Sequence, residues 1–216
     1  MLRGYLAHSN YSAITELAKT SKRVLSQLVA LTLDADELIG WRAVQALGLA
    51  SAIVAARDAE FVRGILRRLQ WSLNDESGSI GWRAAPAMGA ILAASPGTFA
   101  EFAPIVASTL DVDETHFYPG VLWAIGTIAE QHAERVRFIL PQVRALLQNP
   151  SPPTRGLAAW CLGCLRDAAA RAALASMTND AAAFEIFADD AWQARTVGAL
   201  ARAALDAIDA PGTNQR

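Results

Sequence analysis

Small and apolar residues recur around a series of glycines, and polar residues separate the copies. The residues one, two, five and nine positions before the glycine are small or apolar in most copies, as at Ala46-Leu47 and Ala87-Met88. On a helix of 3.6 residues per turn these positions cluster on one face. Each copy therefore predicts an amphipathic helix whose small core residues allow neighbouring helices to approach closely. The glycines are Gly48, Gly89, Gly126, Gly163 and Gly198, at spacings of 41, 37, 37 and 35 residues.

The first two copies are nearly the same ten residues. IGWRAVQALG runs from Ile39 to Gly48, and IGWRAAPAMG runs from Ile80 to Gly89. Between the copies lie other segments with apolar residues at a spacing of three and four, which also predicts helices. These segments are 23–33, 60–73, 99–110 and 135–147. The repeating unit is thus a helix, a turn and a helix of about forty residues, which indicates an α-solenoid.

Two prolines make the pattern more specific. Pro104 and Pro141 fall inside the first helix of their repeats and lie 37 residues apart, the same step that separates Gly126 from Gly163. With this feature the pattern resembles HEAT repeats, in particular the short bacterial HEAT-like type first associated with phycobilisome (PBS) lyases. The resemblance covers about residues 20–166. It implies an all-α, right-handed solenoid of four to five helix pairs, an armadillo-like helical fold found mostly in scaffold proteins.

We expect one domain over residues 1–210. Its repeats are predicted near 20–56, 57–94, 95–131 and 132–166, followed by an atypical C-terminal cap at 167–209 and a flexible tail at 210–216. In the cap, Phe184 and Ile186 alternate with a polar residue, and a similar alternation follows the ADDA turn. This pattern predicts a small β-hairpin. Either this hairpin or a modified last repeat would cover the open end of the solenoid. Thr196 is then a suitable N-cap for a last helix, Val197 to Ile208.

Four tryptophans fall on one face of the glycine helices. Trp41 and Trp82 lie seven residues before their glycine, and Trp123 and Trp160 lie three residues before theirs. Seven and three differ by four, so the four indoles share a face, roughly 150° from the core stripe. One interpretation is a partly exposed aromatic groove, with Arg42 and Arg83 beside the first two indoles. The other is that the indoles pack between repeats.

The two remaining tryptophans belong to other elements. Trp71 lies in a first helix and Trp192 lies in the predicted hairpin. We expect both to be packing residues.

Composition and charge narrow the class of protein. The chain is 53% hydrophobic and 19% charged, so it has ample material for a core, and its net charge of −2 does not favour a nucleic-acid partner. The longest apolar run, 46–56, is too short to span a bilayer, and the start of the chain has no secretory apolar segment. Only two cysteines are present, which is typical of a reducing compartment. We therefore expect a cytoplasmic protein with no membrane partner.

The chemistry-bearing residues do not form a recognisable catalytic set. The histidines, His8, His116 and His132, are far apart in the repeat frame, and none is followed by the glutamate that HEAT-type di-iron hydroxylases use. Cys161 and Cys164 are spaced as CxxC but lie in mid-helix, where two small buried thiols are the favoured interpretation. We expect no catalytic residue, no metal and no cofactor.

These observations favour a non-catalytic scaffold or adaptor that binds a protein or peptide segment in its groove. The predicted binding residues are Trp41, Arg42, Trp82, Arg83, Trp123 and Trp160. The alternative is an enzyme or enzyme accessory for a planar ligand, similar to bilin lyases or to HEAT-like DNA glycosylases. The glycosylase resemblance implies a carboxylate one turn after the groove tryptophans, where this chain has Thr127 and Cys164.

Overall fold

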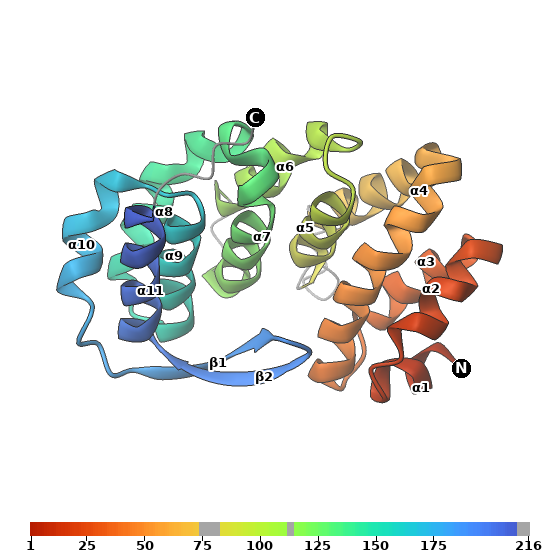
Figure 1. Ribbon diagram of the computed structural model, residues 1–216, viewed down its shortest axis with the longest axis horizontal. Helices are drawn as coiled ribbons and strands as arrows, with labels where there is room; N and C mark the ends of the chain where they lie inside the picture. The colour runs from red at the N-terminus through yellow and green to blue at the C-terminus, as the bar shows by residue number, and fades with distance from the viewer. Residues whose placement is uncertain (74–82, 112–114, 211–216) are drawn as a thin grey trace.

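The computed structural model describes residues 1–73, 83–111 and 115–210. It shows helices stacked side by side along the long axis of the molecule, with one short hairpin crossing them (Figure 1). The main elements are α1 (Leu2–Ala7), α2 (Tyr11–Thr20), α3 (Arg23–Leu31), α4 (Glu37–Leu73), α5 (Ala84–Ala94), α6 (Ala103–Ser108), α7 (Tyr118–Val136), α8 (Leu140–Ala145), α9 (Pro152–Cys164), α10 (Arg171–Ser176), β1 (Ala183–Ala188), β2 (Ala191–Thr196) and α11 (Val197–Asp209).

The helix α4 is two helices joined at a break. Asp58 has φ −150° and ψ 71°, and its carboxylate accepts a hydrogen bond from the backbone N–H of Phe61 at 3.0 Å. An aspartate in this position is an N-cap, so it begins a new helix. By length and apolar composition Glu37–Leu73 is long enough to cross a membrane, but the break divides it and about half of its most apolar window, 56%, is buried inside the protein.

Each repeat consists of a first helix and a second helix, and the second helix carries the glycine of the series. These glycines lie where successive second helices meet. The first part of α4 packs on α5, α5 on α7, α7 on α9 and α9 on α11. A Cβ atom on Gly48 would lie 2.7 Å from the carbonyl oxygen of Ala90, and one on Gly163 would lie 2.6 Å from the Cα atom of Ala204. Both contacts are shorter than van der Waals distance, so only glycine allows this approach. The predicted role of the small-residue stripe is confirmed.

The first helices of the third and fourth repeats are short and interrupted near their prolines. A 3₁₀ turn, Ala100–Phe102, precedes α6, and a second one, Arg137–Ile139, precedes α8. Pro104 and Pro141 then occupy the first turn of the α-helical part. A proline inside a longer helix would leave a backbone carbonyl without a partner and would clash with the preceding turn. The interruption that the two prolines predict is therefore present.

Two further helices extend the stack at the N-terminus. The sequence pattern assigns no repeat to residues 1–19, but α1 and α2 pack against α3 and α4 there. They bury Leu2, Leu6, Ile14 and Ala18. Because the two helices lack the glycine signature, the repeat spacing did not reveal them.

The C-terminal hairpin is confirmed, and so is the helix that follows it. β1 pairs with β2 in antiparallel register from Ala183 opposite Thr196 to Ala188 opposite Ala191. Asp189 and Asp190 form the turn with φ values of 49° and 65°, as a type I′ turn requires. The Thr196 hydroxyl accepts from the N–H of Ala199 at 3.1 Å and so caps α11. Of the predicted tail at 210–216, all but Ala210 lies outside the described residues.

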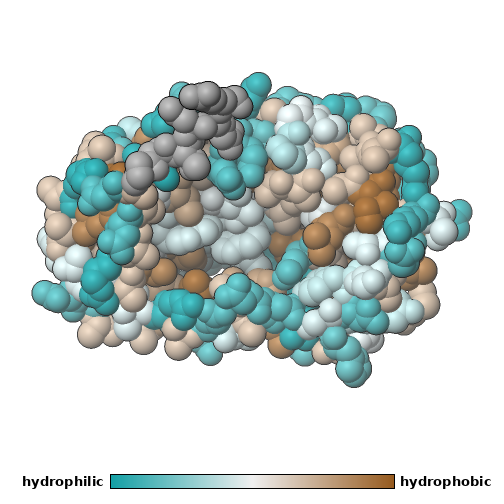
Figure 2. Space-filling model, viewed as in Figure 1, coloured by the Kyte–Doolittle hydropathy of each residue, from teal (hydrophilic) through white to brown (hydrophobic). Residues whose placement is uncertain are grey.

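The hairpin does not cover the open end of the solenoid. From its base beside α11, the hairpin extends across the second helices toward α1 and α4 at the other end of the stack (Figure 1). Its base rests on α9, where the Phe184 ring lies against Gly156. The end of the solenoid is covered by α10 and α11, which pack together, so of the two predicted covers it is the modified last repeat that is present. A hollow remains between the hairpin and the helices (Figure 2).

Candidate functional site

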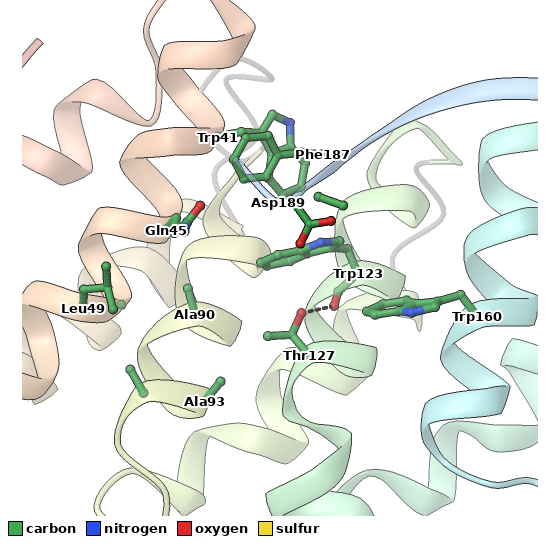
Figure 3. Close-up of a pocket in the computed structure, with 13 residues that line it drawn as sticks. Trp41, Gln45, Leu49, Ala90, Ala93, Trp123, Thr127, Trp160, Phe187 and Asp189 are labelled. Atoms are coloured by element: carbon green, nitrogen blue, oxygen red, sulfur yellow. Dashed lines mark hydrogen bonds between the residues drawn. The ribbon is translucent and has the colours of Figure 1, made fainter. Parts of the chain in front are cut away.

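Three of the four predicted tryptophans line one cavity. Trp41 on α4, Trp123 on α7 and Trp160 on α9 are each half-buried, and they face a cavity of about 470 Å³ (Figure 3). We call it the tryptophan cavity. Its lining is Trp41, Gln45, Gly48, Leu49, Ala90, Ala93, Ala94, Trp123, Thr127, Trp160, Phe187, Ala188 and Asp189. The predicted common face of the three indoles is present, and Trp82 lies outside the described residues.

Trp41 is the centre of a group of aromatic rings that joins the helices to the hairpin. Its ring stacks on Phe187 with 5.7 Å between centroids and 20° between planes. It also meets Trp123 edge to face at 5.1 Å and Trp192 at 6.3 Å. Such pairs contribute about 0.5–1.5 kcal/mol beyond the area that they bury. The aromatic cluster of Trp41, Trp123, Phe187 and Trp192 therefore holds the hairpin against the helices.

The Trp160 ring packs against a glycine, Gly126, on the neighbouring helix α7. A Cβ atom on Gly126 would lie 2.2 Å from the Trp160 ring, so the indole fits against α7 only because this position has no side chain. The Thr127 hydroxyl, next along α7, donates to the backbone carbonyl of Trp123 at 2.8 Å. The contact with Gly126 thus holds the Trp160 indole against α7, beside Trp123 in the cavity wall.

The predicted arginines do not line the cavity. The Arg42 guanidinium donates from Nη1 to the carbonyl oxygens of Leu6 and Ala7, both at 3.1 Å, and forms an ion pair with Asp190 at 3.2 Å. These contacts bind α4 to the end of α1 and to the turn of the hairpin. Arg42 therefore fixes one wall of the site. Direct contact with a partner stays a prediction for this residue.

Arg83 joins two neighbouring repeats in a similar way. Its Nη1 donates to the carbonyl oxygen of Thr32 at 2.7 Å, and its Nη2 lies 3.3 Å from the carboxylate of Glu37. The guanidinium rests on Gly40, where a Cβ atom would approach it to 2.7 Å. This explains the glycine that precedes Trp41 in the repeated sequence. A binding role for Arg83 also stays a prediction.

The turn of the hairpin is held by Ser9 and Tyr11, two side chains that no sequence pattern singles out. The hydroxyls of Ser9 and Tyr11 donate to the carboxylate of Asp190, which also pairs with Arg42. Burial raises the pKa of Tyr11 above its ordinary value, and the neighbouring Asp190 raises it further. The only local signal for this clasp is the pair of aspartates at the turn. Their partners lie near the other end of the chain.

A second, smaller cavity of about 150 Å³ lies beside the aromatic cluster. Pro119 lines it at the helical position that Trp41 occupies in its own repeat, seven residues before the glycine, and Pro153 lines it from a position ten residues before Gly163. Trp41, Trp123 and Phe187 line both cavities. The hairpin therefore divides the hollow into two chambers with a shared aromatic wall.

The structure corrects one expectation about the other tryptophans. Trp71 was expected to pack, but it is 80% exposed. It follows Leu69, a core residue of the same helix, by two positions, and this turns it about 200° away from the core. Trp192 is half-buried in the aromatic cluster, so its expected packing role is confirmed.

The described residues offer no obvious reactive group. Burial raises the pKa of Cys161 well above its ordinary value and that of Cys164 to about 11, so both thiols are protonated at neutral pH. Burial lowers the pKa of His132, and the nearby Arg135 lowers it further. Within residues 1–73, 83–111 and 115–210, no group of three or more His, Cys, Asp or Glu side chains is arranged to hold a metal ion.

Comparisons with known proteins agree with this architecture. The HEAT-like repeat family matches residues 119–165, the segment from α7 to α9. A designed armadillo repeat protein in complex with the peptide (KR)4 aligns with a TM-score of 0.54 and 21% identity, over 94% of this chain and 92% of that one. The crystal structure of an engineered protein aligns with a TM-score of 0.56 and 15% identity, over 92% and 88%. At these identities the likeness shows the fold alone. No curated protein matches in sequence.

Proposed function

We propose that this HEAT-like repeat protein is a non-catalytic scaffold that binds a segment of a protein or peptide partner at the tryptophan cavity. The observation that carries the proposal is that Trp41, Trp123 and Trp160 face one cavity from three separate helices. Each indole remains partly accessible. Burying such rings would contribute strongly to affinity, because tryptophan is enriched among the residues that dominate binding energy.

The form of the site supports a short segment as the ligand. The hairpin crosses the face of the second helices (Figure 1), and its Phe187 ring stacks on Trp41, so an extended chain could not run straight along this face. The cavity of about 470 Å³ has the volume of one or two large side chains or of a small molecule. A loop or a chain end that inserts an anchoring side chain therefore fits the site best.

The fold gives independent support. One similar solved structure, the designed armadillo repeat protein, is in complex with a peptide. Repeat proteins of this kind present the inner surface of the stack to their partners. In this chain, the tryptophan cavity lies on the face formed by the second helices and includes residues of α4, α5, α7 and α9.

The two predicted arginines have a supporting role in this proposal. Arg42 and Arg83 hold the walls around Trp41 through contacts with α1, the hairpin and Glu37. Trp82 remains a predicted binding residue. It lies outside the described residues, so the proposal does not depend on it.

A peptide-display selection against the purified protein tests the proposal. Peptides selected on the wild type should bind the double variant Trp123→Leu/Trp160→Leu at least about tenfold more weakly, because two anchoring surfaces are lost. Trp71→Leu is the control, since Trp71 is exposed elsewhere and does not line the cavity. Circular dichroism would establish that both variants are folded. Equal binding of the selected peptides to all three proteins would contradict the proposal, and a bound planar ligand that co-purifies only with the wild type would favour the alternative function.

A further inference from the structure

The only charge on the described lining of the tryptophan cavity is negative. Asp189 is the one charged side chain among the described residues that line it, and the rest of the lining is aromatic, aliphatic or neutral. The faces of aromatic rings carry partial negative charge, which attracts cations and repels anions. A carboxylate beside three indoles thus makes a cavity that favours a positive ligand.

The position of Asp189 is fixed by the turn of the hairpin. Its φ of 49° belongs to a type I′ turn, and one carboxylate oxygen, Oδ2, accepts from Nε2 of Gln193 at 3.0 Å. In the close-up the carboxylate is drawn between Phe187 and Trp123, and all three side chains line the cavity (Figure 3). Since a carboxylate offers about four acceptor positions, most of its capacity remains for a ligand.

We propose that the tryptophan cavity binds a quaternary ammonium group, with Asp189 as its counter-ion and the indoles of Trp41, Trp123 and Trp160 as its walls. The inference rests on the proposed function, because it names the chemistry of the anchoring side chain that a bound segment would present. A fully methylated amine at the end of an aliphatic stem is the group that fits.

The cavity lining has few hydrogen-bond acceptors, so it favours a quaternary ammonium group over the side chain of an unmodified lysine or arginine. A lysine ammonium has three N–H donors and a guanidinium has five, and each would lose its hydration in the cavity. Besides Asp189, the polar side chains of the lining are Gln45 and Thr127, and Thr127 already donates to the Trp123 carbonyl. A quaternary ammonium has no N–H to satisfy, and its methyl groups pack directly against aromatic faces.

The charge of the lining also disfavours anions and neutral planar ligands. An anion would approach both the Asp189 carboxylate and the negative faces of the indoles. A neutral planar molecule would gain the area of the indoles but would leave Asp189 partly desolvated without a counter-charge, which costs free energy. Only a cation uses every feature of the lining.

Choline and its neutral isostere, 3,3-dimethyl-1-butanol, provide the test, since they share one shape and differ in charge. Titration followed by tryptophan fluorescence and calorimetry should show choline binding about tenfold more tightly to the wild type, as expected for a cation between aromatic faces and a carboxylate. Asp189→Asn should weaken choline about fivefold and leave the neutral alcohol unchanged. Asparagine tolerates positive φ, so this variant keeps the turn. Trp71→Leu, outside the cavity, is the control for both ligands.

Equal binding of choline and the neutral alcohol to the wild type would overturn the inference, and so would an Asp189→Asn variant that binds choline unchanged. The same experiments distinguish a failure of this inference from a failure of the proposed function. If selected peptides depend on Trp123 and Trp160 but choline is not preferred, the scaffold function stands and the cation inference fails. If choline is preferred but no peptide is selected, the cavity is a small-molecule cation site and the scaffold function fails.

Discussion

The hydroxyl of Tyr11 donates a hydrogen bond to the carboxylate of Asp190, 179 residues further along the chain. Ser9 and Arg42 bind the same carboxylate. This clasp joins the second helix of the chain to the turn of the C-terminal hairpin, so the two ends of the helical stack are tied across its face. In an open solenoid each repeat contacts only its neighbours. Here the hairpin adds a contact between repeats that are far apart.

The first prediction concerns this clasp. Tyr11→Phe removes one hydrogen bond to a charged acceptor and leaves the ring in place, so it should lower the free energy of unfolding by about 1–2 kcal/mol. Urea unfolding followed by circular dichroism would measure the change. Tyr5→Phe is the control, because Tyr5 is also half-buried and its hydroxyl has no hydrogen-bond partner among the described residues. Equal stability of the two variants would show that the clasp does not contribute.

The second prediction concerns the contact between Phe187 and Trp41. Phe187→Ala removes a buried ring from the aromatic cluster and should release the hairpin from the helices before the rest of the protein unfolds. Trypsin cleavage after the exposed Arg195 of β2 should then be at least about tenfold faster than in the wild type, because a paired strand resists proteolysis. Cleavage at an unchanged rate would mean that the clasp alone holds the hairpin.

The sequence revealed the repeating parts of the fold because packing imposes a period on them. Gly48, Gly89 and Gly163 recur since each sits where two helices touch, and the same frame placed Trp123 and Trp160 on the open face. The hairpin could be predicted from alternation around Glu185. The glycine spacing and the strand alternation are patterns within short stretches of sequence, and such patterns indicate which side of a helix or strand is buried.

The contacts of Asp190 and Arg42 could not be predicted from the sequence, because they join segments that are distant along the chain. Nothing near Asp190 indicates that Ser9 and Tyr11 will bind it, because the partners lie about 180 residues away. The same is true of Arg42, which the sequence placed beside Trp41 in an aromatic groove and whose guanidinium contacts α1 and the hairpin. Such pairs have no period, so they become visible only when the chain is folded.

The third prediction concerns the glycine series. Gly48→Ala places a Cβ atom 2.7 Å from the backbone oxygen of Ala90, and a backbone atom in a packed helix cannot move aside easily. The variant should lose about 1–3 kcal/mol of stability. Gly64→Ala is the matched control, since Gly64 lies in a helix with nothing within 4 Å of its added Cβ. That variant should gain about 0.5–1 kcal/mol from helix propensity. A loss of stability in both variants, or in neither, would contradict the close-approach explanation.

The fourth prediction concerns pH. Burial raises the pKa of Cys164 to about 11 and that of Cys161 well above its ordinary value, whereas both ionise near 8.5 in an unfolded chain. The contribution of the protonated thiols is thus fully present below about pH 8.5, and it falls as the pH rises toward the folded pKa values.

The stability of the wild type should therefore decrease between pH 7.5 and pH 9.5, by about 1 kcal/mol or more for each buried thiol. Cys161→Ala/Cys164→Ala should remove this part of the pH dependence. Alanine already stands at the position of Cys161 in other repeats, at Ala46, Ala87 and Ala124, so the fold should tolerate it there. Urea unfolding of both proteins at the two pH values would measure the difference. If their stabilities changed in parallel, the thiols would have to be accessible to solvent, and the close packing of α9 against α7 and α11 would be wrong.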